Sequence, residues 1–597
     1  MSNDAKERIE SFRQQMKQYH IDLYVIPNSD FHNSEYIGEY FKAIKYLTGF
    51  TGSAATVVIT QKTAYLWTDG RYFIQAAKQL SGSGITLMRA GEEGVPKVKE
   101  FIKDFLKEGG CIGFDGRTLD FKTGETYKKI AKENGALLFD GKDLVDSIWK
   151  DRPKMPREPF FILEDRYSGK STKEKLKAVR EAMQKTGADT HILASLTDIA
   201  WILNVRGRDI SHVPVVISYL VITKEDCFWF VQKEIITKEQ NVYFEENGIT
   251  VCPYEEIYSY IESLGEASVL YQPDLLNYRI ASRLPGHTQK ITKKNPSERL
   301  KAVKNPVEIS NTILAHIKDG VAFTKFMYWL KTRIGKETVT EFLAGEYLEK
   351  MRREQEHFLE NSFDTICAYG QNAAMMHYQA AREDNLVLQP TGFLLVDSGG
   401  HYLEGTTDIT RTIALGALTG QMKKHFTAVL RANLQLSSAK FLYGCSGQNL
   451  DILARGPLWD LGLDYKCGTG HGVGHLLNVH EGPNSFRWKK REEEEEAVLE
   501  EGMITTDEPG VYLEGEYGIR IENELLCQKA EKNEYGQFMQ FETITYAPID
   551  LDAVNVNELT DREKKLLNSY HKKVYQVLSA YLTDEENDWL KEYTRTI

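Results

Sequence analysis

The last third of the chain concentrates residues able to bind a metal in five segments, and the first two constrain the fold most strongly. FLLVDSGG (393–400) places Asp397 at the end of an apolar strand, and LEGTTDITRTIAL (403–415) places Asp408 inside a second strand. Aspartate is disfavoured in strands, so a half-buried Asp408 needs a partner. A strand, a glycine turn and a returning strand would bring the two carboxylates face to face, where they repel unless a cation lies between them. Taken singly, an aspartate in a strand is more often a surface residue or a hydrogen-bonded turn residue than a metal ligand.

The third segment, GTGHGVGHLLNVHEGP (468–483), holds His471, His475 and His480 among five glycines. Glycine permits a close approach of the backbone and unusual backbone angles. The segment is not a dinucleotide fingerprint, because Val473 stands where that motif needs its third glycine. His471 and His475 have the spacing of a zinc-binding helix, but each glycine between them costs such a helix about 1 kcal/mol relative to alanine. We therefore expect histidines on a non-helical segment.

The fourth and fifth segments add acidic residues. MITTDEPGVY (503–512) reads as a strand that ends at Asp507 and Glu508. GIRIENELLC (518–527) alternates so that Arg520, Glu522 and Glu524 share one face of a strand. Carboxylate and imidazole ligands without a thiolate suit manganese, cobalt or zinc better than a soft-metal site.

The 597 residues are enough for three or four domains at roughly 100–200 residues each. Prolines among charged residues indicate a boundary at about 150–170, and a second connector lies near 295–308. The segment after the first boundary echoes the N-terminal one: ADTHILAS (188–195) resembles IDLYVIPNS (21–29), and WILNVRG (201–207) resembles YLTGFTG (46–52). The echo indicates two copies of one α/β domain, although chance also produces matches of this length.

The periodicity of apolar residues predicts a helix over 5–19 and a strand over 22–26, followed by strand-like segments over 46–60 and 63–73. After the connector near 295–308, helices are expected up to about 357. A strand-rich block follows over 363–547, interrupted by helices near 421–442 and 447–461, and the tail from 557 is expected to be an amphipathic helix. The acidic run 492–496 is expected to be a solvated loop or helix face.

The composition excludes several classes of protein. The 7 cysteines are odd in number and widely spaced without a CxxC pair, which argues against a disulfide framework and for a reducing compartment. The charged N-terminus does not resemble a signal peptide, and the longest apolar stretch is far shorter than the ~20 residues of a membrane span. A net charge of −12 does not favour nucleic-acid binding. We expect a cytoplasmic protein that binds neither nucleic acid nor membranes.

The order Asp–Asp–His–Glu–Glu, in the settings VDSGG, TTDITRT, GTGHGVGH, DEPG and IRIEN, resembles that of the creatinase/methionine-aminopeptidase ("pita-bread") metallopeptidases. IPNSDFHNSEYI, LWTDGRYF and LTDIAWILNVRGRDISHVPV narrow the resemblance to the three-domain aminopeptidase P, or Xaa-Pro aminopeptidase, family. The resemblance covers essentially the whole chain. It implies a multidomain α/β and α+β protein: creatinase-N-like domains over 1–155 and 156–303, then a pita-bread catalytic domain with a C-terminal helical extension over 304–597.

The resemblance also implies a dinuclear metal site. It makes Asp397 a ligand of one ion, Asp408 and Glu522 bridging ligands, and His471 and Glu508 ligands of the second ion. His471 is preferred because it begins the HGVG motif, and His475 stays open as the alternative. Three further residues match family positions that are not ligands: His377 and His480, as catalytic and substrate-binding histidines, and Arg71, which in the family reaches a neighbouring subunit's site. Pairing with Asp69 is the simpler explanation of Arg71.

The implied activity is hydrolysis of the N-terminal bond of peptides with proline in the second position, by a hydroxide that bridges two divalent ions. Manganese is the family's metal, with cobalt and zinc as alternatives, and Glu508 serves as general base while Arg520 orients a ligand carboxylate. The family implies a homodimer. The alternatives are a prolidase, which has the same ligands but typically a shorter chain with two domains, and a non-catalytic peptide-binding relative or a creatinase-like amidinohydrolase, both of which lack the metal ligands.

Overall fold

The structure, a computed structural model, describes residues 2–490 and 496–597. The chain divides into two compact units: the first runs to Ile162 and continues over Lys170–Ser297, and the second comprises Leu163–Gly169 and Glu298–Ile597. All of the acidic run 492–496 except its last residue lies outside the described residues.

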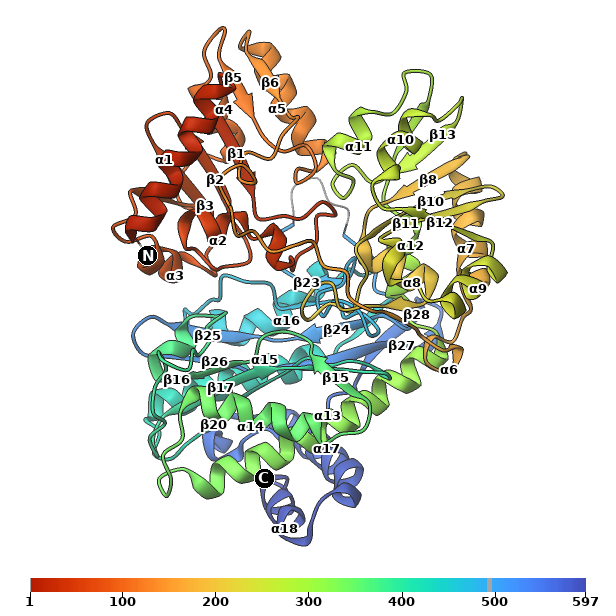
Figure 1. Ribbon diagram of the computed structural model, residues 1–597. Helices are drawn as coiled ribbons and strands as arrows, with labels where there is room; N and C mark the ends of the chain where they lie inside the picture. The colour runs from red at the N-terminus through yellow and green to blue at the C-terminus, as the bar shows by residue number, and fades with distance from the viewer. Residues whose placement is uncertain (1, 491–495) are drawn as a thin grey trace. The chain divides into compact units, whose positions relative to one another are not determined.

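The first unit contains two six-stranded mixed sheets of identical topology (Figure 1). In the first, β1 (Leu23–Pro27) pairs antiparallel with β2 (Thr56–Thr60) and parallel with β5 (Cys111–Gly113). In the second, β8 (Thr190–Leu193) pairs in the same two ways with β10 (Ser218–Thr223) and β13 (Ser268–Tyr271). The outer strands repeat the pattern as well: β3 (Ala64–Thr68), β4 (Ile85–Arg89) and β6 (Leu137–Phe139) correspond to β11 (Cys227–Val231), β12 (Ile249–Pro253) and β14 (Gln289–Thr292). The internal duplication indicated by the sequence echo is therefore a duplication of fold.

The predicted strand over 46–60 is partly wrong. Its first residues end helix α2 (Ala43–Thr48), and only β2 is a strand. The echoing segment ends helix α8 (Leu196–Leu203) in the same way. The helices stop at Gly49 (φ 77°) and Asn204 (φ 53°), which occupy the same position of the echo. Glycine and asparagine tolerate the left-handed conformation that ends a helix, and this signal outweighs a short apolar pattern.

Helices cover both sheets of the first unit. The predicted N-terminal helix is α1 (Ser2–Gln18), whose Ile9, Phe12 and Met16 are buried in the core beside β1. The other elements of the unit are α3 (Phe73–Gln79), α4 (Val98–Phe105), α5 (Phe121–Glu133), α7 (Thr172–Thr186), α9 (Lys238–Glu246), α10 (Glu256–Glu262), α11 (Tyr278–Ser282) and the short strands β7 (Phe161–Ile162) and β9 (Val205–Arg206).

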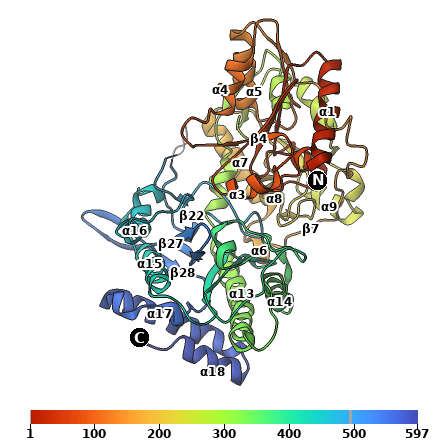
Figure 2. The same cartoon turned by 90° about the vertical axis from the view of Figure 1, so that its left-hand side faces the viewer.

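In the second unit, helices lie on both sides of short antiparallel sheets. Figure 2 shows α13 (Pro306–Arg333) and α14 (Glu341–Arg353) on one side of the strands, and α15 (Gly420–Ser437) and α16 (Gly447–Trp459) on the other. The sheets are β16 (Ile366–Tyr369), β17 (Phe393–Ser398) and β20 (Ile409–Ala414); β21 (Lys440–Leu442), β28 (Gly536–Thr543), β27 (Asn523–Asn533) and β24 (Ile504–Asp507); and β15 (Phe358–Asn361), β18 (Gly400–Tyr402) and β19 (Gly405–Thr406). Two pairs complete them: β22 (Gly470–His471) with β23 (Ser485–Phe486), and β25 (Gly510–Leu513) with β26 (Tyr517–Arg520).

The two helices predicted near 421–442 and 447–461 are confirmed as α15 and α16. The tail differs from the prediction, because it forms two helices, α17 (Asp561–Leu578) and α18 (Asp584–Tyr593), each begun by a threonine capping box. The connectors are structured too, by α6 (Asp165–Ser168) and α12 (Pro296–Ala302). The domain boundaries at 155/156 and 303/304 stay predictions.

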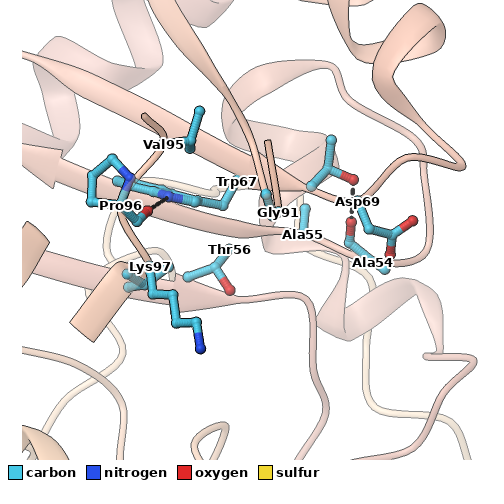
Figure 3. A pocket seen from close by; sticks show the side chains of 12 residues that line it. Ala54, Ala55, Thr56, Trp67, Asp69, Gly91, Val95, Pro96 and Lys97 are labelled. Atoms are coloured by element: carbon cyan, nitrogen blue, oxygen red, sulfur yellow. Dashed lines mark hydrogen bonds between the residues drawn. The ribbon is translucent and has the colours of Figure 1, made fainter. Parts of the chain in front are cut away.

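One pocket of about 330 Å³ lies in the first unit, between the ends of β3 and β4 and the start of α4 (Figure 3). Its walls are mostly apolar, and the Trp67 indole donates a hydrogen bond to the Pro96 carbonyl (2.8 Å). None of its lining residues belongs to the predicted metal ligands. Among the helices that the structure describes, none has the length and apolar character to cross a bilayer.

Candidate metal centre

Asp397 and Asp408 come from neighbouring strands of one antiparallel sheet. Asp397 is the last residue but one of β17 and lies opposite Thr410 of β20, and Asp408 lies one residue before β20 rather than inside a strand as predicted. Both side chains therefore start from the same face of the pair. The chain returns between them at Gly399, where a Cβ atom would lie 1.8 Å from the Thr407 carbonyl oxygen. Only glycine allows the two aspartate segments to approach so closely.

His471 brings an imidazole to these carboxylates. Its Nδ1 lies 3.0 Å from the Gly472 carbonyl oxygen, which can only accept, so Nδ1 carries the proton and Nε2 presents a lone pair. Nε2 is 3.5 Å from Asp408 Oδ2 and 3.5 Å from Glu508 Oε1. Potential ligand atoms of Asp408, His471 and Glu522 all lie within 4.8 Å of one another. The expected non-helical setting is confirmed: Gly470 packs so tightly that a Cβ would lie 1.8 Å from the Thr506 carbonyl oxygen.

Threonine hydroxyls orient the two glutamates. Thr410 donates to Glu522 (2.7 Å), and Thr506 donates to Glu508 (3.3 Å). The predicted continuous strand over 518–527 is wrong, because β26 ends at Arg520 and β27 begins at Asn523. Glu522 lies in this break, where it is buried. A break between two sheets leaves the periodicity of side chains almost unchanged, so alternation alone does not reveal it.

The electrostatics of the cluster are unfavourable for ionised acids. Burial raises the pKa of the Asp408 carboxyl well above its usual range, and the charges of Asp397, Glu508 and Glu524 raise it further. Burial likewise raises the pKa of Glu522, with Asp408 as the largest charged contributor. The Arg520 guanidinium pairs with Asp397 and donates to the Tyr512 hydroxyl (2.6 Å). A single guanidinium faces four carboxylates, so the site needs further positive charge to keep them ionised.

The donor atoms fit divalent cations. Among the described residues, no hydrogen-bond partner reaches the buried Oδ1 of Asp397 or the buried Oδ1 of Asp408. Buried carboxylate oxygens without a partner are costly unless a cation occupies them. The nearby Cys467 thiol is not a competing ligand, because burial raises its pKa to about 12 and keeps it protonated. Oxygen and imidazole donors without thiolate are the set that manganese, cobalt or zinc accepts.

The two other histidines of the glycine-rich segment, His480 and His475, lie in different surroundings. His480 lies beside His471, with ring centroids 4.3 Å apart and the rings nearly perpendicular. His475 is buried, and its two ring nitrogens contact the Thr312 hydroxyl (3.1 Å) and the Tyr167 carbonyl (2.9 Å). Of the two histidines that the spacing leaves open, His471 is the one that lies among the acids.

His377 is half-buried in the segment after the 3₁₀ turn η3 (Gly370–Ala374). That turn packs against β26, the strand that carries Arg520: a Cβ on Gly518 would lie 1.9 Å from the Ala373 carbonyl oxygen. Arg71 belongs to the first unit, where its Nε and Nη2 donate to both carboxylate oxygens of Asp69 at 2.9 and 2.7 Å. In this chain Arg71 therefore pairs with Asp69, which is the simpler of the two interpretations of this residue.

Sequence reasoning missed two residues around the aspartates, His316 and Asp319 of α13, which are fully buried. The available signal was their spacing. With Thr312 they stand at i, i+4 and i+7 of a helix otherwise rich in apolar residues, and polar residues at such positions indicate a buried polar face.

Comparison with known families accounts for almost the entire chain. Residues 8–148 and 151–308 each match the creatinase/prolidase N-terminal domain. Residues 312–529 match metallopeptidase family M24, and residues 537–597 match the C-terminal region of peptidase M24. These two matches to creatinase/prolidase N-terminal domains agree with the two sheets of identical topology.

The chain is 36% identical to aminopeptidase P1 of Arabidopsis thaliana, over 97% of each chain. It is also 36% identical to a probable Xaa-Pro aminopeptidase P of Coprinopsis cinerea, over 100% of this chain and 99% of that one. Among solved structures, X-prolyl aminopeptidase from Caenorhabditis elegans, described as a cytosolic enzyme with a di-nuclear active site, superposes with a TM-score of 0.94 at 33% identity over 99% of this chain and 100% of that one. A prolidase from Pyrococcus horikoshii (23% identical) covers 63% of this chain with a TM-score of 0.50 and shares the fold alone.

The predicted family and fold class are confirmed by these comparisons, by their coverage of the whole chain and by the matched domain order. The chain therefore belongs to the Xaa-Pro aminopeptidases, the aminopeptidase P enzymes of metallopeptidase family M24.

Proposed function

We propose that this enzyme removes the N-terminal residue from peptides with proline in the second position, using two divalent metal ions, with manganese as the working metal. The observation that carries the proposal is the cluster of buried Asp408 and Glu522 with half-buried His471, in which the pKa of each carboxyl is raised by burial and by its acidic neighbours. Such a cluster is stable as carboxylates only around cations.

In the proposed ligand set, Asp397 binds one ion, Asp408 and Glu522 bridge, and His471 and Glu508 bind the other. Several contacts support it. Asp397 and Asp408 each present an oxygen without a protein partner among the described residues, and the Nε2 of His471 faces Asp408 and Glu508 at 3.5 Å. The Nδ1 contact to the Gly472 carbonyl orients the ring, as is usual for histidine ligands.

When bound, the two ions would lower the pKa of a shared water and polarise the scissile carbonyl, which supplies a nucleophile near neutral pH. The chain's own residues then handle protons and orient the peptide. Glu508 accepts the proton released from the nucleophile and delivers it to the leaving proline nitrogen. His480, beside His471, and His377 donate hydrogen bonds to the carbonyl oxygen as negative charge develops on it. Arg520 pairs with the Asp397 carboxylate and orients it.

The substrate follows from the chemistry of the bond. A bond to proline lacks the N–H that general peptidases use for recognition, so a dedicated site is needed. In this proposal the free α-amine of the substrate, a cation, binds among the acidic residues, which fixes the cleavage to the first peptide bond. A homodimer in the cytoplasm, with Arg71 released from Asp69 to reach a partner's site, completes the proposal; it rests on the family and on the cytosolic neighbour enzyme.

The test is a peptide assay with controlled metal. The chelated full-length protein is given Mn²⁺, Co²⁺ or Zn²⁺ and offered Arg-Pro-Pro, Arg-Ala-Ala and Ala-Pro. Metal-dependent release of arginine from Arg-Pro-Pro, with Mn²⁺ most effective, is the expected result. Cleavage of Ala-Pro alone would replace the proposal by a prolidase, and no cleavage with any metal would remove it.

The dimer has its own measurement. Analytical ultracentrifugation gives the mass of the wild-type protein, and an Arg71→Ala variant is compared with Arg89→Ala, an arginine of the same unit. Loss of activity in Arg71→Ala alone, at unchanged mass, supports the role of Arg71. A monomeric, fully active wild type would exclude it.

A further inference from the structure

Helix α13 carries a buried polar stripe that the proposed catalysis does not use. Thr312, His316 and Asp319 follow one another at i, i+4 and i+7 on one face of the helix, and their exposed fractions are 3%, 0% and 0%. Burying a polar side chain costs free energy unless it is paired, so each member needs a specific partner. Their partners include Thr407, Glu524 and His475, which lie on the segments that bear Asp408, Glu522 and His471.

Asp319 contacts the neighbours of both aspartates. The Thr407 hydroxyl, one residue before Asp408, donates to Asp319 Oδ2 (2.8 Å). Arg352 of α14 pairs with the two oxygens of Asp319 at 2.6 and 3.1 Å, and its Nη2 also donates to the Ser398 hydroxyl (3.1 Å), one residue after Asp397. The fully buried ion pair of Asp319 and Arg352 thus binds the residue next to each of the two aspartates.

His316 is connected to Asp408 through Glu524. Its Nε2 lies 3.0 Å from Oε2 of Glu524, a buried residue of β27. This is an ion-pair distance without the geometry of a hydrogen bond among the described residues. The other oxygen of Glu524 accepts the backbone N–H of Asp408 itself (2.8 Å). The backbone at Asp408 is therefore held at two points: Glu524 accepts a hydrogen bond from the N–H of Asp408, and Asp319 accepts one from the hydroxyl of the preceding residue. Glu524 contacts His316 of α13 and Asp319 belongs to α13, so both contacts lead to this helix.

Stability alone does not explain this arrangement. A buried ion pair is often no more stabilising than apolar residues of the same volume, so the pair of Asp319 and Arg352 gives the fold little that leucine and methionine would not. What apolar residues cannot supply is a fixed orientation of the hydroxyls of Thr407 and Ser398. Asp408 and Asp397 are the adjacent residues, so these contacts hold the backbone beside each carboxylate.

We propose that the stripe on α13 positions the metal-binding carboxylates, with Asp319 and His316 as positioning residues that fix Asp408 relative to Asp397. The inference rests on the proposed metal site, and its effect is on metal affinity. Loss of residues that orient ligands typically weakens metal binding about 10–100-fold. An equal loss is expected here when the link between α13 and Asp408 is cut.

The experiment compares Asp319→Asn and Thr407→Val with a matched control, Asp550→Asn. Asp550 is also a buried acid and also holds β20, since it accepts the backbone N–H of Ala414 (2.8 Å) and pairs with Lys331 (2.6 Å), but at the end of the strand away from Asp408. Titration calorimetry of Mn²⁺ into each full-length apoprotein gives the affinity, and thermal unfolding of the apoproteins gives the stability.

Asp319→Asn and Thr407→Val should each weaken Mn²⁺ binding about tenfold or more. The KM for Arg-Pro-Pro at saturating Mn²⁺ should stay unchanged. Asp550→Asn should lower the melting temperature of the apoprotein with Mn²⁺ affinity unchanged. Wild-type affinity in a folded Asp319→Asn protein would overturn the inference, as would an equal loss in Asp550→Asn, because affinity would then follow general stability.

If Asp319→Asn does not fold, Thr407→Val decides, since it removes one hydroxyl and keeps the ion pair. A wild-type protein that binds no Mn²⁺ is a different result. It refutes the proposed metal site, whereas a wild type that binds Mn²⁺ and variants that bind it equally well refute only the role of α13.

Discussion

At the scale of single residues, Asp408 has the most consequences for the site. It is buried, its Oδ1 has no partner among the described residues, and it faces His471. We predict that Asp408→Ala abolishes both activity and metal retention, because a bridging ligand serves both ions. Elemental analysis after gel filtration measures the metal, with the exposed Glu337→Ala as control. Wild-type metal content in Asp408→Ala would contradict the bridging assignment.

Substitutions of the two neighbouring histidines, His471 and His480, should have different effects on metal binding and turnover. His480→Ala is expected to keep the metal and to lose most turnover, about 100-fold or more, because it removes a donor to the developing oxyanion. His471→Ala should lose metal instead. Activity assays paired with metal analysis distinguish the two, and loss of metal from His480→Ala would mean that the histidine roles are exchanged.

At the scale of elements, the first unit contains a buried histidine that links its two sheets. The Nδ1 of His32 contacts the Ala194 carbonyl (3.0 Å), and its Nε2 contacts the Tyr254 hydroxyl (2.8 Å). Since a carbonyl only accepts, Nδ1 carries the single proton of a neutral ring. Burial lowers the pKa of His32 from 6.5 to about 4, against a smaller opposing effect of Asp30.

This shift predicts a loss of stability in acid. Between pH 6.5 and 4 the unfolded state binds the proton and the folded state does not, so the stability contributed by the neutral ring is complete above pH 6.5 and falls as the pH falls. At pH 5 the loss is about 2 kcal/mol, from 1.36 kcal/mol per pKa unit. Urea unfolding of the first unit at pH 7.5 and pH 5 gives the pH dependence of its free energy of unfolding. This dependence should be smaller in His32→Gln than in the wild type, and unchanged in His287→Gln, whose histidine is exposed. An unchanged dependence in His32→Gln would refute it.

At the scale of the whole molecule, the proposed metal ligands all belong to the second of the two units. Calorimetric unfolding of the apoprotein should therefore respond to Mn²⁺ in one transition only. At a free Mn²⁺ concentration 100 times Kd, the stabilisation is about 2.7 kcal/mol. The Asp408→Ala protein is the control, because its transitions should not move. A shift of both transitions with Mn²⁺ would show that the ions bind elsewhere or that the units unfold together.

Much of this enzyme is determined by local sequence. The glycines of VDSGG and GTGHGVGH predict close backbone approaches, and Gly399 and Gly470 each lie where a Cβ would clash with a carbonyl oxygen. The echo of two N-terminal segments predicts the duplicated domain, and the aspartates, histidines and glutamates predict the family. These features are readable because they depend on residue type and short spacing, which a linear sequence preserves.

Tertiary structure alone decided the rest. The break between β26 and β27 at Glu522, the separate partners of His475, and the contacts of α13 with Thr407 and Glu524 depend on pairings between segments that are distant in the chain. The helical period shows that Asp319 and His316 lie on the same face of α13, but it does not show which residues pack against that face. Local patterns fix what a segment can form, whereas the partner of a buried charge is selected only when distant segments pack together and exclude water.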